Sequence, residues 1–189
     1  MGENQDSLLE IVRKKLKQNI TQIENRSDLT EEEKISLIVK TFSATCAAIA
    51  IQPIPFADIF ILTPIQAYMG SRIGAIRGLP ISERKVKEII KEIGGIVGLG
   101  LLAQQLVISG YKTFIPFLGA ITTIPIVYGM TYAIGKVIDA YFIQKRKSGK
   151  IDPEVLKSLW KDMLKKGKKI GKEQADNIKK AKDEYATWD

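Results

Sequence analysis

The residue types that most often carry out chemistry are nearly absent from this chain. It has no histidine, and Cys46 is its only cysteine. A zinc site, an intramolecular disulfide and a histidine-based catalytic triad are therefore excluded. There is also no Walker-type phosphate-binding loop. The sequence predicts a protein that is not an enzyme and that needs no metal or cofactor.

Asp58 is the carboxylate with the most unusual surroundings. It is one of only four charged side chains within residues 39–81. An ionisable group inside a dry core or a membrane needs a charged partner or a function. Asp58 could cap the helix that follows it by accepting backbone N–H bonds. It could instead form a buried polar site with Lys112, Arg72 or a ligand, and the sequence leaves both interpretations open.

The charge of the chain is concentrated near its C-terminus. The net charge is +8, and residues 145–189 hold fourteen Lys and Arg against eight Asp and Glu. This excess predicts an anionic partner. Nucleic acid is disfavoured because there is no zinc-finger spacing and no aromatic RNA-binding signature. Anionic lipid headgroups fit better beside the long apolar segments.

A basic amphipathic helix is predicted to begin at Pro153. Asp152 is a good N-cap, and proline is well placed at the first helical position. Apolar side chains recur at helical spacing beside lysines, so the helix could lie at a membrane interface with its tryptophan at headgroup depth. Alternatively, the apolar stripe packs on the core and the lysines are solvated. The residues assigned to lipid-surface contact are Trp160, Lys157, Lys161, Lys165 and Lys166.

Gly94 and Gly98 lie four positions apart in a segment that is predicted to be an apolar helix. This spacing lets two helices approach closely. The close approach could occur inside one helical core, or it could join two chains in a homo-oligomer. The sequence does not decide between these alternatives.

Hydrophobic periodicity predicts helices throughout and shows no sustained alternation typical of strands. A first amphipathic helix ends before a turn at residues 25–28, and Thr30 with Glu33 forms a capping box at the start of the next helix. The predicted helices after this turn cover residues 31–51, 56–78, 82–108 and 114–144, with a last one opening at residue 153.

An internal repeat relates the two apolar parts of the chain. Seven identities recur at an offset of sixty-one residues, which predicts two similar hairpins at about residues 36–76 and 97–137. Each would have an Ile-Pro-Phe corner between two apolar helices, and the pair would form a four-helix core. The corner residues are Pro55 and Phe56 in the first unit, and Pro116 and Phe117 in the second.

The apolar stretches are uneven in length. A membrane span needs about twenty apolar residues, and residues 114–134 reach this length although two prolines interrupt them. The other stretches are shorter, which favours shallow hairpins or a bundle buried against itself over four independent spans. The basic segments would share one side, so the sequence predicts an inner or internal membrane with cytoplasmic tails. A cytoplasmic location is the alternative.

The run Pro-Ile-Pro-Phe-Ala-Asp at residues 53–58, with Pro64-Ile65-Gln66 and Ile73-Gly74 after it, resembles a bacterial domain of unknown function. That family is found C-terminal to Era-like GTPase domains and in inner-membrane proteins of the YcjF type. The resemblance covers about residues 36–143 and implies a helical, membrane-associated region that works beside a GTPase. Because the phosphate-binding loop is missing, any GTP hydrolysis would come from a separate partner.

These patterns together predict an all-α protein in three parts: an amphipathic helix at residues 1–28, a two-hairpin domain at 29–147, and a basic helix and tail at 148–189. The predicted function is a non-catalytic, membrane-associated adaptor or scaffold that partners a GTPase or organises a membrane structure. A soluble helical interaction protein with a buried core is the first alternative. A small channel or carrier is the second, although few polar residues could line it.

Overall fold

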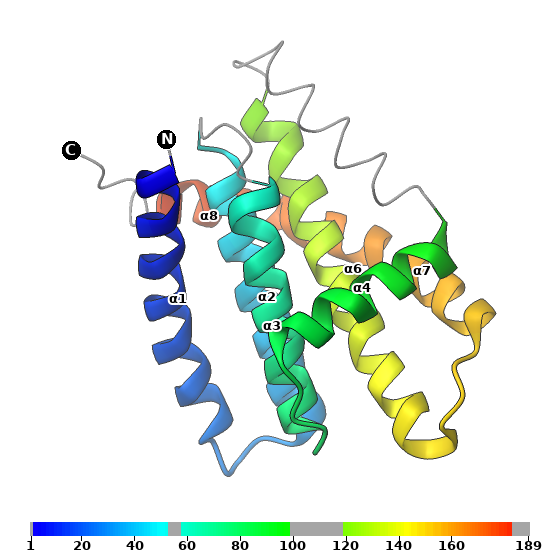
Figure 1. The fold of residues 1–189 in the computed structure, drawn as a ribbon. Helices are drawn as coiled ribbons and strands as arrows, with labels where there is room; N and C mark the ends of the chain where they lie inside the picture. The colour runs from blue at the N-terminus through cyan, green and yellow to red at the C-terminus, as the bar shows by residue number, and fades with distance from the viewer. Residues whose placement is uncertain (1, 53–57, 99–118, 183–189) are drawn as a thin grey trace.

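The computed structural model describes residues 2–52, 58–98 and 119–182, and over these residues it confirms the predicted all-α fold (Figure 1). No strand occurs in the described ranges. The elements are α1 (Gly2–Glu24), α2 (Glu31–Ala50), a π-helical turn η1 (Asp58–Leu62), α3 (Thr63–Ile76), α4 (Glu83–Val97), α6 (Gly119–Ser148), α7 (Pro153–Glu173) and α8 (Ala175–Lys182).

The helices form a bundle around α6. In Figure 1, α1 runs downward, α2 returns upward, and α3 and α6 both run downward. α7 turns back at the lower end of α6 and packs along it, and α8 reaches α2. The two most extensive helix contacts are those of α6 with α7 and with α2. α6 is therefore the helix against which α2, α3 and α7 pack, whereas α1 packs on α2 and α3.

Local sequence signals explain where several helices begin. At α2, the Thr30 hydroxyl accepts a hydrogen bond from the Glu33 N–H, and the Glu33 carboxylate accepts one from the Thr30 N–H, so the predicted capping box is present. The Ser82 side chain accepts a hydrogen bond from the Lys85 N–H at the start of α4. These bonds satisfy N–H groups that have no partner inside the first helical turn.

The first helix belongs to the core rather than standing apart from it. Its stripe of Leu8, Val12, Leu16 and Ile20 is almost completely buried at the four-residue spacing of one helix face. The same cluster contains Leu156 and other side chains from α2, α3, α6 and α7. The segments predicted as N-terminal and C-terminal additions therefore share one hydrophobic core with the central helices.

α4 is shorter and more peripheral than predicted. The predicted helix continues to residue 108, whereas α4 ends at Val97, and Gly98 at its C-cap has a φ of +93°. A positive φ is not helical and favours glycine, so the chain leaves the helix there. α4 buries only Val86, Ile89 and Ile93 among its described residues. The most extensive helix contact in the core is supplied by α7 on α6 instead.

Two prolines that are equivalent in the predicted repeat lie in different parts of their helices. Pro64 lies in the first turn of α3, where a missing N–H costs little, whereas Pro125 lies inside α6. The glycines that end the repeat are both tightly packed, because a Cβ on Gly74 would lie 2.7 Å from the Leu79 carbonyl oxygen and one on Gly135 would lie 2.7 Å from a Val39 methyl. The hairpin corners Pro55, Phe56, Pro116 and Phe117 lie outside the described residues.

Candidate functional site

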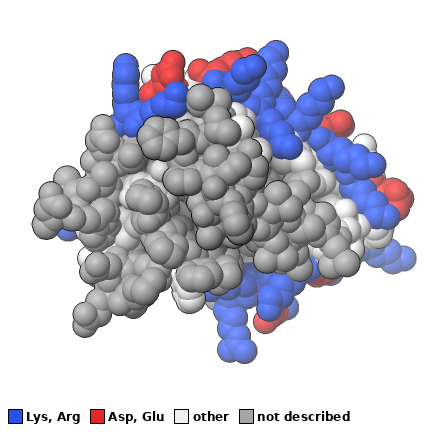
Figure 2. Space-filling model, turned by 90° about the horizontal axis from the view of Figure 1, so that it is seen from above, with Lys and Arg blue, Asp and Glu red and all other residues white. Residues whose placement is uncertain are grey.

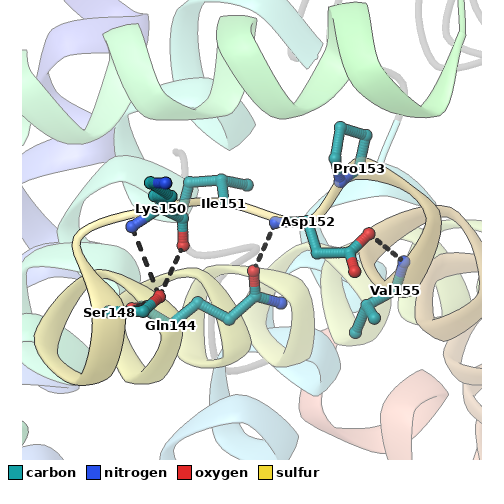
Figure 3. A pocket seen from close by; sticks show the side chains of 7 residues that line it. All are labelled: Gln144, Ser148, Lys150, Ile151, Asp152, Pro153 and Val155. Carbon is teal, nitrogen blue, oxygen red and sulfur yellow. Dashed lines mark hydrogen bonds between the residues drawn. The ribbon is translucent and has the colours of Figure 1, made fainter.

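A hydrogen-bonded turn between α6 and α7 fixes the direction of the basic helix (Figure 3). The Gln144 side-chain oxygen accepts a hydrogen bond of 2.7 Å from the Asp152 N–H, and the Ser148 hydroxyl donates to the Lys150 carbonyl at 3.2 Å. An Asp152 carboxylate oxygen then accepts bonds from the N–H groups of Glu154 and Val155. The predicted N-cap is therefore present, and the chain reverses so that α7 returns along α6.

Three glycines bring α6 and α7 almost into backbone contact. A Cβ on Gly167 would lie 2.9 Å from the Gly129 Cα, and a Cβ on Gly129 would lie 2.9 Å from the Lys168 backbone nitrogen. One turn further, a Cβ on Gly171 would lie 3.1 Å from the Pro125 Cα. Cβ contacts below 3.0 Å essentially never occur in real structures, so glycine is required for this close approach.

This close contact was not predicted, although the sequence contained a signal for it. Gly167 and Gly171 have the same four-residue spacing as Gly94 and Gly98. They lie among lysines rather than in an apolar run, so their spacing alone does not predict a close helix contact. The described structure uses the pair in the basic helix for intramolecular packing.

The apolar stripe of α7 packs on the protein. Leu156 is fully buried, and Trp160 is only 8 % exposed. The sequence allows this helix to lie at a lipid interface or to dock on the core, and in the structure Leu156 and Trp160 dock on the core. Trp160, which was assigned to lipid contact, faces the inside of the bundle. α7 is therefore held to the bundle by its apolar face, and its polar face points toward solvent.

The lysines of α7 remain at the surface. The helix has seven lysines and three acidic residues, and Lys161, Lys165 and Lys166 are exposed. Lys157 is half-exposed, and its ammonium donates a 2.6 Å hydrogen bond to Glu154. No other α7 lysine forms a salt bridge with a described acidic residue. Lys and Arg side chains stand out around the edge of the molecule when it is seen from above in Figure 2.

A buried ion-pair network ties three helices together in the C-terminal half of α6. The Arg77 Nε donates to Asp139 Oδ1 at 2.7 Å, and Nη2 donates to Oδ2 at 3.2 Å. Nη1 also donates to Glu32 at 2.8 Å and to Glu31 at 3.2 Å. The hydrogen bonds from Arg77 to Asp139 raise the pKa of the guanidinium. The network joins the N-terminus of α2 to α3 and α6, so its geometry supports a structural role.

Two other predicted site residues differ in their surroundings. Gly94 is half-buried within α4, whereas Gly98 is exposed and caps the helix. A Cβ on Gly98 would meet no described atom within 4 Å. Gly98 therefore makes no close contact with the described parts of the chain, and a helix contact at Gly94 stays a prediction. Asp58 begins η1, and its side chain lies outside the described residues.

The described residues contain no group of three or more His, Cys, Asp or Glu side chains that could hold a metal ion.

Within the described part of the chain, one helix, covering residues Thr122–Ser148, is long and apolar enough to cross a membrane. Most of its apolar segment is buried by the other helices, as is usual for the central helix of a bundle.

The comparisons with known proteins support membrane association at a coarse level. No family model matches the chain, so its resemblance to the GTPase-associated family stays a prediction. No solved structure matches it either. A curated protein, magnetosome membrane protein 22 of Magnetospirillum gryphiswaldense, is 26 % identical over 138 residues, which cover 70 % of each chain. This chain is thus distantly similar to a membrane protein, and that similarity fits a membrane-associated, non-catalytic role.

Proposed function

We propose that this protein is a non-catalytic, membrane-associated adaptor or scaffold that contacts anionic lipid headgroups through the exposed lysines of α7. Two findings support the proposal: the distant relative is a membrane protein, and α7 displays lysines that have few acidic partners among the described residues. The single observation that carries it is the docking of α7 by its apolar stripe, which fixes the lysine face outward.

The docked stripe defines the kind of membrane contact. Because Leu156 and Trp160 are buried, α7 does not need to insert an apolar face into lipid. Its contact would be electrostatic, with each lysine near an anionic surface contributing about 1 kcal/mol. Such binding weakens as salt screens the charges. The first alternative, a soluble helical interaction protein, predicts no preference for anionic vesicles.

Neutralising the outward lysines of α7 is expected to weaken binding to anionic vesicles by up to about a hundredfold. The variant is Lys161→Gln/Lys165→Gln/Lys169→Gln, whose three positions are all exposed. At about 1 kcal/mol each, the loss amounts to roughly two orders of magnitude. The measurement is co-sedimentation of the full chain with phosphatidylcholine vesicles that do or do not contain phosphatidylglycerol, at low and high salt.

The matched control removes three exposed charges elsewhere, as Lys14→Gln/Lys17→Gln/Lys87→Gln on α1 and α4. This variant should bind nearly as the unmodified protein does. Equal losses in the two variants would show that only net charge matters and would contradict the assignment to α7. Deletion of α7 is unsuitable for this test, because it would expose the packed face of α6.

We further propose, on the resemblance over residues 36–143, that the adaptor's partner is a separate GTPase. A complex recovered from the native host by cross-linking should contain a protein that hydrolyses GTP. A complex whose other component neither binds nor hydrolyses GTP would contradict this part of the proposal.

The oligomeric state of the protein distinguishes a scaffold from an adaptor, because a scaffold must self-associate and an adaptor can act as a monomer.

A further inference from the structure

A groove lies between α1 and α3 at the edge of the bundle. α1 is the outermost helix on the left of Figure 1, and the groove beside it has a volume of about 630 Å³. Tyr68 and Arg72 line it from α3, and charged side chains of α1 line it from the other side. Because α1 has no further helix outside it in this view, a second molecule could approach the groove.

The two arginines that line the groove already have carboxylate partners inside the chain. The Arg72 Nε donates a hydrogen bond of 2.8 Å to Glu24 Oε1. Arg13 forms an ion pair with Glu83, and its guanidinium carbon lies 5.3 Å from the centroid of the Tyr68 ring. These contacts fix the position of α1 against α3 and α4, and they leave the other charged groups of the groove to be explained.

Four charged residues of α1 line the groove without such partners. Asp6, Glu10, Lys14 and Lys17 are all exposed, and none of them forms a salt bridge within the described ranges. Their spacing of four, four and three residues places them on one helix face. We call these four residues the charged stripe, and its acidic half precedes its basic half.

The charged stripe is complementary to itself when a second copy runs in the opposite direction. Asp6 of one copy would then face Lys17 of the second copy, and Glu10 would face Lys14. Both pairs are centred near residue 12, so one twofold axis generates all four ion pairs over about 16 Å of helix. A parallel arrangement would instead place like charges together. The order of the charges therefore selects both the partner and its direction.

We propose that the groove between α1 and α3 docks α1 of a second copy of this chain, in an antiparallel, twofold-symmetric homodimer. The charged stripe supplies the ion pairs across the interface. Exposed ion pairs are individually weak, so the dimer should weaken further as salt screens them. The inference goes beyond the proposed function, because the interface lies on α1 and requires no lipid.

The test uses two charge-swapped forms of the full chain. Asp6→Lys/Glu10→Lys makes the charged stripe wholly basic, and Lys14→Glu/Lys17→Glu makes it wholly acidic. Each form alone should self-associate about tenfold more weakly or worse, because attraction across the axis becomes repulsion. An equimolar mixture should regain a dimer with one chain of each form. Sedimentation velocity at several concentrations measures the association, and circular dichroism checks that each form keeps its helices.

Net charge alone predicts a different result. Because the chain carries a charge of +8, the acidic form would then self-associate more strongly than the unmodified chain. The control Asp162→Lys/Glu173→Lys adds the charge of the basic form at exposed positions of α7 and should leave the dimer unchanged. A stronger dimer of the acidic form, an equal loss in the control, or a mixture that stays monomeric would overturn the proposal. An unmodified chain that is monomeric at every concentration would overturn it as well.

Cross-linking tests the direction of the two helices. Cys46 is fully buried, so a short thiol-reactive linker should act on introduced cysteines. A chain with Asp6→Cys, mixed with a chain with Lys17→Cys, should give cross-linked mixed dimers, whereas Asp6→Cys alone should not. Efficient cross-linking of Asp6→Cys to itself would show a parallel pair and contradict the proposal.

The dimer and the lipid contact of α7 can fail separately. Loss of the dimer in the charge-swapped forms concerns α1 alone, whereas the Lys161, Lys165 and Lys169 variant reports on vesicle binding. The vesicle control that carries Lys14→Gln and Lys17→Gln is compared at protein concentrations at which the unmodified chain is monomeric, so that it reports charge and not dimerisation. A dimer without a preference for anionic vesicles would contradict the proposed function and leave this interface in place.

Discussion

Replacing Asp139 with Asn is expected to lower the free energy of unfolding by about 3 kcal/mol. The Arg77 and Asp139 side chains are only 7 % and 13 % exposed, and removal of one partner from a buried ion pair typically costs about 3–5 kcal/mol. Arg77 would remain charged in a buried position. Glu31 and Glu32 still contact its guanidinium, so we place the cost at the lower end of the range. Urea unfolding followed by circular dichroism provides the measurement.

Two further variants show whether the loss comes from an uncompensated charge. Glu32→Gln removes an acidic group whose side chain is 71 % exposed, and exposed ion pairs contribute only about 0–1 kcal/mol. The double variant Arg77→Met/Asp139→Leu removes both buried charges and should recover much of the lost stability. If the double variant were as unstable as Asp139→Asn, the effect would come from packing and not from the orphaned guanidinium.

Much of the helical framework could be predicted because its signals are local. The capping box of Thr30 and Glu33 and the N-cap of Asp152 are complete within a few residues, and each is present in the structure. The stripe from Leu8 to Ile20 follows from helical spacing alone. Such features depend on neighbours along the chain, so their prediction requires no knowledge of the tertiary fold.

Features that depend on distant contacts were harder to predict. The bonds between Arg77 and Asp139 join residues 62 positions apart, and neither residue has a local pattern that indicates its partner. The role of Trp160 was ambiguous for a related reason, since an apolar stripe fits a lipid interface and a protein surface equally well. The stripe packs on protein because α6 lies against it, and the position of α6 cannot be read from the sequence of α7 alone.

The glycine pairs also show that a local pattern does not predict a distant contact. Four-residue spacing indicates that a close helix contact can form, but it does not say whether the helix continues through both glycines. At Gly98 the chain leaves α4 with a φ of +93°, so Gly98→Leu would strain the backbone whether or not chains self-associate. At Gly167 and Gly171 the helix continues, and the contact with α6 forms.

Substitution of Gly167 by Ala is expected to lower the free energy of unfolding by about 1–3 kcal/mol, although alanine is the better helix former. The new methyl would lie 2.9 Å from the Gly129 Cα and 2.9 Å from the Tyr132 Cβ. These are backbone and Cβ atoms that cannot rotate away, so α6 and α7 must separate, and overpacking of this kind typically costs about 1–3 kcal/mol. A larger residue, as in Gly167→Leu, should displace α7 and increase the exposure of Trp160, which a red shift of its fluorescence would report.

Gly95→Ala is the matched control, because this glycine also lies inside a helix but a Cβ there would meet no described atom within 4 Å. It should leave stability unchanged or raise it by up to about 1 kcal/mol through helix propensity alone. Opposite signs for the two glycine-to-alanine substitutions would therefore identify close packing as the cause. Stabilisation by Gly167→Ala would show that α7 does not pack closely on α6, and the outward orientation of its lysines would then lose its structural basis.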